Sequence, residues 1–186
     1  LGSLGGDPDL AAFSVINGYV VYLLDILCLS ATYGLQPIAS FNCGARRFDR
    51  LSELVKVSLG GTLAVLAVVC GLVIAFAEPI STFFIGDDPQ LIELTASHFL
   101  PLLACAPFGF LAQVASAYFQ AVGQERISIL LGVGRYPLFA IPMIVVLAAV
   151  EGLTGVWWSQ PPADLMAAAL AVALAARECG KLRRAG

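Results

Sequence analysis

The sequence predicts an all-α integral membrane protein, a bundle of five transmembrane helices, and three observations support this prediction. Of the 186 residues, 59% are hydrophobic and only 12% are charged, about half of the usual quarter. Five apolar runs are each long enough, at about 20 residues, to cross a bilayer as a helix. A soluble domain of this size could not bury so much apolar surface, and a disordered chain would be poor in apolar residues.

Each predicted helix has an apolar centre with at most one ionisable residue. The first centre contains Asp25, the second none, the third His98, the fourth Arg135 and the fifth Asp164. The strands of a membrane barrel would be shorter and would alternate in polarity, so helices are expected. The predicted helices belong to one membrane domain, residues 1–186, and span 10–41, 54–77, 90–122, 128–150 and 156–177.

The distribution of basic residues predicts how the helices cross the membrane, because cytoplasmic loops carry an excess of Lys and Arg. If the five helices alternate in direction, nine of the ten basic residues fall on one side, whereas the short segments on the other side are acidic. We therefore expect a multi-pass membrane protein with its N-terminus outside and its C-terminus in the cytoplasm. The nine residues are Arg46, Arg47, Arg50, Lys56, Arg126, Arg177, Lys181, Arg183 and Arg184.

The start of the chain suggests that it is part of a longer protein. It begins at Leu1 rather than Met, and the predicted orientation places this end outside without a signal peptide. A cut inside one half of an even-spanning transporter would leave an odd number of helices, and the repeat related to this half would then be missing. We therefore expect a C-terminal fragment.

Asp25 is expected to face the interior of the bundle, because a charge at membrane depth usually faces a cavity or a partner. At about 100° per residue, small and polar side chains share its helix face. Such a face suits an aqueous cavity, and it equally suits close packing between helices. The residues on this face are Ser14, Gly18, Asp25, Thr32 and Gln36.

Arg135 and Asp164 are the other charges within the predicted helices. Glycines at 132 and 134 and Pro137 predict an irregular backbone around Arg135, which is tolerated where it lines a cavity or is buried in protein. Arg135 could shape a transport pathway, or it could form a structural ion pair with Asp25, Asp164 or an acid outside this chain. Asp164 follows two prolines near a helix start, where an acid often caps the helix or reaches the interface. The candidate transport-path residues are therefore Asp25, Gln36, Arg135 and Asp164.

We expect no enzyme activity and no catalytic, cofactor or metal site. The sequence has no glycine-rich phosphate loop, no HExxH motif and no nucleophile elbow. The five cysteines are scattered, without CxxC spacing, and are expected to be buried apolar residues. His98 is the only histidine and is expected to be structural. A net charge of −3 without a basic stripe argues against nucleic acid as a partner.

Four segments resemble the multidrug and toxic compound extrusion (MATE) family, in the same order and at the same spacing. Gly34-Leu35-Gln36-Pro37-Ile38 with Phe41-Asn42-Cys43-Gly44-Ala45 is similar to the end of the family's eighth helix. Tyr118-Phe119-Gln120-Ala121-Val122-Gly123 resembles the end of its tenth helix. Arg135 with Ile141-Pro142 resembles the eleventh, and Gly155-Val156-Trp157 with Pro161 and Asp164 resembles the twelfth.

This resemblance implies a twelve-helix antiporter of two lobes, of which the chain is the C-terminal lobe from the loop after the seventh helix. Such a protein exports organic cations or other drugs in exchange for sodium ions or protons by alternating access. Some members bind the coupling cation with an acid in the tenth helix, but residues 94–124 contain none. The coupling site is therefore expected in the missing N-terminal lobe of the same polypeptide. The partners implied are a small organic cation and the lipid bilayer.

Two other functions stay open at this point. One is a flippase for lipid-linked sugars of the same superfamily, although such proteins tend to line their cavity with several arginines. The other is a membrane scaffold that does not transport, although a scaffold has no reason to bury Asp25 and Arg135.

Overall fold

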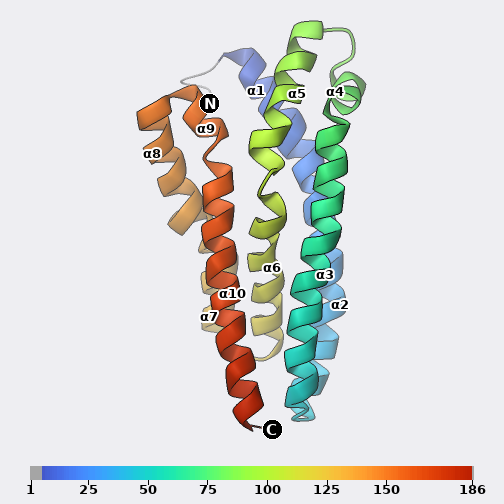
Figure 1. Cartoon of the computed structure of the whole chain (residues 1–186), viewed down its shortest axis with the longest axis vertical. Helices are drawn as coiled ribbons and strands as arrows, with labels where there is room; N and C mark the ends of the chain where they lie inside the picture. Colours follow the sequence, from blue (N-terminus) through green and yellow to red (C-terminus); the bar gives the residue numbers. More distant parts are fainter. Residues whose placement is uncertain (1–5, 186) are drawn as a thin grey trace.

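The computed structural model describes residues 6–185, and every regular element in that range is helical. The helices run lengthwise between two ends of the molecule, α1 starting at one end and α10 finishing at the other (Figure 1). The prediction of an all-α fold is therefore confirmed for the described residues. The elements are α1 (Asp7–Val15), η1 (Ile16–Val21), α2 (Tyr22–Gly44), α3 (Phe48–Ala75), α4 (Ala77–Ile85), α5 (Pro89–Leu103), α6 (Ala106–Ala121), α7 (Glu125–Gly132), η2 (Arg135–Ala140), α8 (Ile141–Glu151), α9 (Leu153–Trp157) and α10 (Gln160–Ala185).

The first long helix, formed by α1, η1 and α2, is continuous over 38 residues. At its start the Asp9 carboxylate accepts a hydrogen bond from the Gly6 N–H at 3.1 Å, which pairs one of the free N–H groups at the beginning of the helix. The segment η1 is a π-helix, in which each turn holds more residues than an α-helical turn. This change of pitch matters for the face predicted to contain Asp25, because that face was drawn for a regular α-helix.

The second long helix, α3, is followed by the short helix α4 and a tight turn into α5. Gly86 takes a φ of 84° in this turn, a conformation that favours glycine. Asp88 then caps α5, its carboxylate accepting from the backbone N–H groups of Gln90 at 3.1 Å and Leu91 at 3.2 Å. The helix α3 itself corresponds to the predicted span 54–77. It begins at Phe48, six residues earlier than predicted, and ends at Ala75.

Two predicted helices are bent in the structure. The third consists of α5 and α6, which meet at 49° after Pro101, and the fourth consists of α7 and then η2 with α8, which meet at 46°. The second bend lies at residues 133–134, which include Gly134 and follow Gly132, and the π-helical segment η2 comes directly after it.

By length and hydropathy, two described helices could cross a membrane, or up to four if each bent pair counts as one span. These are Asp7–Gly44, Phe48–Ala75 and the two bent pairs. The fifth predicted span corresponds to α9 and α10, which do not pass this test. Pro161, Pro162 and Asp164 near its start and Arg177 and Glu178 toward its end interrupt the apolar part of α10. The count of five membrane crossings stays a prediction.

The helix α6 lies at the centre of the bundle, packed against α2, α3, α7 and α10. Most of its residues are buried, including Phe110, Tyr118 and Phe119. Its neighbour α10 buries alanines at four-residue spacing, and such small residues let two helix backbones approach closely. These alanines are Ala163, Ala167, Ala171 and Ala175.

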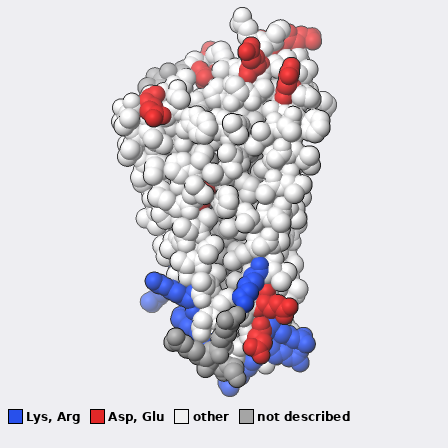
Figure 2. All heavy atoms as spheres, in the orientation of Figure 1, with Lys and Arg blue, Asp and Glu red and all other residues white. Residues whose placement is uncertain are grey.

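Charged side chains lie mainly at the two ends of the bundle and leave a broad uncharged band between them (Figure 2). One end, here the basic end, contains the α2–α3 and α6–α7 connections with Arg46 and Arg126 and the last turns of α10 with Lys181. The opposite end, the acidic end, contains the start of α1 and the α4–α5 connection. The band is the surface expected of a protein within a bilayer.

Candidate functional site

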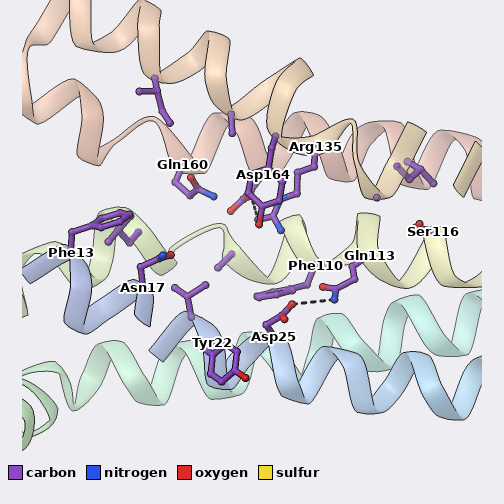
Figure 3. Close-up of a pocket in the computed structure, with 18 residues that line it drawn as sticks. Phe13, Asn17, Tyr22, Asp25, Phe110, Gln113, Ser116, Arg135, Gln160 and Asp164 are labelled. Atoms are coloured by element: carbon purple, nitrogen blue, oxygen red, sulfur yellow. Dashed lines mark hydrogen bonds and ion pairs between the residues drawn. The ribbon is translucent and has the colours of Figure 1, made fainter. Parts of the chain in front are cut away.

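A cavity of about 620 Å³ lies in the bundle, between the first long helix, α6, η2 and the start of α10 (Figure 3). Its size falls within the range of small-molecule sites in proteins. Four aromatic rings line it: Phe13, Tyr22, Phe110 and Tyr136. Its polar lining consists of Asn17, Asp25, Gln113, Ser116, Arg135, Gln160 and Asp164.

Arg135 and Asp164 form an ion pair on one side of the cavity. The Arg135 Nη2 atom donates to Asp164 Oδ1 at 2.5 Å. The Asp164 side chain is 1% exposed, and that of Arg135 is 13% exposed. Of the partners that the sequence left open for Arg135, the structure selects Asp164. Asp164 therefore neither caps α10 nor reaches the membrane interface.

Packing also holds the guanidinium of Arg135 in place. Its Cζ atom lies 5.7 Å from the centroid of the Phe110 ring and 5.6 Å from that of Tyr136. Aromatic faces at this distance attract a cation. Arg135 is the first residue of η2, where the π-helical turn follows the glycine-containing bend. The irregular backbone that the sequence predicted here is present.

Asp25 lies on the other side of the cavity, in the first turn of α2. Its Oδ1 atom accepts a hydrogen bond from Gln113 Nε2 of α6 at 3.1 Å. The residue is half-buried, and among the described residues no Lys or Arg forms an ion pair with it. In Figure 3 the ring of Phe110 lies between Asp25 and the Arg135–Asp164 pair.

Three of the four candidate residues, Asp25, Arg135 and Asp164, thus line one cavity. Gln36 does not. It is half-buried near the basic end, where its Nε2 atom donates to Gln120 Oε1 of α6 at 3.4 Å. One turn further along α2, the Ser40 hydroxyl donates to the carbonyl oxygen of Ala121 at 3.1 Å. Gln36 therefore belongs to a contact between α2 and α6, away from the cavity.

The face predicted to contain Asp25 is not continuous. Ser14 and Gly18 are exposed, whereas Thr32 is buried. The π-helical segment η1 lies between Ser14 and Asp25, so 100° per residue does not describe the rotation there. Asn17, which the prediction left out, lines the cavity in place of Ser14 and Gly18.

Gln113 is the main residue that sequence reasoning missed. It is a polar side chain in the apolar run of α6, which is the signal that could have indicated it. His98, expected to be structural, packs on Trp157 with ring centroids 3.9 Å apart near the acidic end. Within residues 6–185, no group of three or more His, Cys, Asp or Glu residues is placed to hold a metal ion.

Comparison with known proteins identifies the family. The family model named MatE matches residues 1–146. The multidrug export protein MepA of Staphylococcus haemolyticus is 24% identical over 167 residues, which are 90% of this chain and 36% of that protein. A protein named FAD transporter of Shewanella oneidensis is 26% identical over 161 residues, or 86% of this chain and 34% of that protein.

Two solved structures share the fold. A crystal structure of a mutant of the Vibrio cholerae MATE transporter VcmN has a TM-score of 0.85 at 16% identity, covering all of this chain and 41% of that one. An inward-facing multidrug resistance MATE transporter has a TM-score of 0.81 at 16% identity, covering 93% and 39%. The chain thus spans between a third and about two fifths of the length of these relatives. Because the family model matches well over half of the chain, this integral membrane protein belongs to the MatE family of transporters, as the resemblance of its helix ends predicted.

Proposed function

We propose that the polypeptide containing this chain is a secondary active antiporter that exports organic cations or drugs in exchange for sodium ions or protons by alternating access. The observation that carries this proposal is the charge of the cavity: Arg135 compensates Asp164, whereas no described Lys or Arg compensates Asp25. The described residues that line the cavity include two carboxylates and one guanidinium, which gives a formal charge of −1. In a site of low dielectric constant, one uncompensated negative charge favours a cationic ligand.

The aromatic lining supports a ligand that is organic as well as cationic. The rings of Phe13, Tyr22, Phe110 and Tyr136 can contact an apolar body, and an aromatic face also attracts a positive charge. One relative is named a multidrug export protein and another a FAD transporter, so family membership alone does not determine the substrate. The charge of the cavity is the property that favours a cation here.

The two other functions have less support. A lipid-linked sugar with phosphate groups needs several cationic side chains, but the described cavity is lined by one arginine, which is already paired with Asp164. A scaffold would gain nothing from a half-buried carboxylate in a cavity of about 620 Å³. Because the chain covers about a third of its curated relatives, we propose that further helices of the same polypeptide complete the pathway and hold the coupling-ion site.

Transport by purified protein in vesicles tests the proposal. The natural polypeptide that contains this chain is reconstituted with a fluorescent organic cation, and a sodium or a proton gradient is imposed separately. One of the two gradients should drive movement of the cation, and dissipating that gradient should abolish it. Movement that ignores both gradients would contradict antiport, and binding of the cation without any movement would indicate the scaffold.

We also propose that the basic end of the bundle faces the cytoplasm, so that the N-terminal side of α1 is outside. Asp88→Cys tests this orientation, since Asp88 is exposed in the α4–α5 connection. An impermeant thiol reagent should label this cysteine from outside intact cells. An introduced cysteine at Arg126, at the basic end, should react only after the membrane is opened. The reverse pattern would invert the proposed orientation.

A further inference from the structure

Three neighbouring residues of α6, Gly109, Phe110 and Gln113, lie against the three charged groups of the cavity in different ways. Gln113 donates to Asp25, and Phe110 lies 5.7 Å from the guanidinium carbon of Arg135. Gly109 lies one turn before Gln113, on the same helix face, and is buried. It offers no side chain at all, and the space next to its Cα is occupied by the ion pair.

A side chain at residue 109 would collide with the Arg135–Asp164 pair itself. A Cβ atom built there would overlap with Asp164 Oδ1 and with Arg135 Nη2, the two atoms that form the hydrogen bond. Not every helical glycine is so confined: a Cβ atom at Gly34 of α2 or at Gly71 of α3 would meet nothing within 4 Å. Gly132, Gly134 and Gly155 are also confined, but there a Cβ atom would meet the Ser116 hydroxyl or a backbone carbonyl oxygen. Among the described glycines, the collision with the ion pair is therefore particular to Gly109.

We propose that Gly109 is a positioning residue of this cavity, because the bare backbone that it presents lets Arg135 and Asp164 stay paired against α6. The ion pair joins η2 to α10 and keeps the Arg135 guanidinium directed toward the Asp164 carboxylate. The negative charge that faces a ligand then resides on Asp25, which Gln113 orients from the same helix face. This last consequence rests on the proposed function, whereas the dependence of the pair on Gly109 does not.

The physical consequence of a side chain at residue 109 follows from this packing. Gly109→Ala must push the Asp164 carboxylate or the Arg135 guanidinium away, and overpacking of this kind destabilises a protein. A displaced guanidinium stays within the cavity that Asp25 also lines, and there it competes with a cationic substrate for that carboxylate. The KM for a cation should rise more than kcat falls, because the substitution changes the charge that binds the cation.

A double-mutant cycle tests the proposal by thermal unfolding, in the natural polypeptide that contains this chain. Gly109→Ala should lower the Tm by about 5 °C in the wild-type background. In the background Arg135→Ala/Asp164→Ala, both colliding atoms are gone, so the same substitution should leave the Tm unchanged. If Gly109→Ala alone does not fold, restored expression in that background gives the same support. Gly34→Ala and Gly71→Ala are the matched controls, and neither should lower the Tm in either background.

An equal loss of Tm in the two backgrounds would overturn the proposal, because Gly109 would then serve the helix backbone and not the ion pair. Transport adds a second measurement: the KM for the fluorescent cation should rise about tenfold in Gly109→Ala, with kcat nearly unchanged. A loss confined to kcat would overturn the link to Asp25. Since the unfolding cycle needs no transport, a protein that moves no cation can still show the coupling, and the proposed function would then fail while the role of Gly109 stands.

Discussion

The two carboxylates of the cavity, Asp164 and Asp25, have opposite environments. Asp164 is 1% exposed and accepts a hydrogen bond from the Arg135 guanidinium at 2.5 Å. Asp25 is half-buried, and its partner is the uncharged amide of Gln113 at 3.1 Å. A guanidinium neutralises the acid that it binds, whereas an amide orients an acid and leaves its charge in place. The partner of a buried charge, more than its depth, therefore decides what the charge can do.

The comparison also reverses what the linear sequence suggests about depth. Asp25 is in the middle of a long apolar run, whereas Asp164 follows two prolines near a helix start. In the structure Asp164 is the more deeply buried of the two, because α10 packs against α6 and η2 and Asp164 itself lies against Gly109 and Arg135 of these elements. The position of a residue within an apolar run and the burial of its side chain in the bundle are separate properties. Only the burial tells which groups surround the charge.

The largest expected effect is that of Arg135→Ala on stability. It leaves the Asp164 carboxylate buried without a compensating charge, which should cost about 3–5 kcal/mol. Thermal unfolding in detergent, followed by the loss of the monodisperse peak, measures the change. Arg135→Lys keeps the charge but not the planar geometry, and it should lose less.

The double variant Arg135→Ala/Asp164→Ala is the control for this prediction. It removes both charges together, so it should be more stable than Arg135→Ala alone, since a pair replaced by apolar groups leaves no isolated ion. If the double variant were less stable than the single variant, Asp164 would not depend on Arg135, and the contrast with Asp25 would disappear.

Asp25→Asn should affect transport and leave stability nearly unchanged. Asparagine can still accept the hydrogen bond of Gln113, but the negative charge is lost, and transport of an organic cation should fall about tenfold or more. Vesicle uptake measured beside thermal unfolding separates the two quantities. Glu93→Gln neutralises an exposed carboxylate outside the cavity and should alter neither. Unchanged cation transport by Asp25→Asn would show that Asp25 does not bind the substrate.

The smallest expected effect is that of Gln113→Leu. It removes the donor that orients the Asp25 carboxylate but preserves the charge and most of the volume. The loss of one such hydrogen bond is worth about 1 kcal/mol, so the KM for the cation should rise by about fivefold. Initial rates over a range of cation concentrations measure it. A decrease as large as that of Asp25→Asn would mean that Gln113 itself contacts the substrate.

The sequence predicted the fold class and the family correctly. Composition and the length of the apolar runs predict helices in a bilayer, and the motifs around Gln36, Gln120 and Arg135 indicate MATE transporters. It also predicted the irregular backbone at Arg135, because the two glycines before it and the proline two residues after it act locally. Such features depend on neighbours along the chain, which the sequence displays directly.

The candidate site was predicted in part. Asp25, Arg135 and Asp164 were selected because a charge within an apolar run is expensive, and they do meet in one cavity. Gln36 was selected because it shares a helix face with Asp25, but it lies eleven residues further along α2, about 16 Å along the axis, and so beyond the cavity. Gln113 was missed because an amide carries no charge and so attracts less attention in a sequence.

The sequence by itself determined that Arg135 needs a partner at membrane depth, and it left three kinds of partner open. Only the tertiary structure decided that the partner is Asp164, that Gln113 serves Asp25, and that residue 109 must be glycine to leave room for the pair. The physical reason is that a charge's requirement for compensation follows from its own chemistry and the apolar run around it. Which group meets that requirement depends on how helices distant in the sequence pack, and on the absence of a side chain at residue 109, where the pair fills the space.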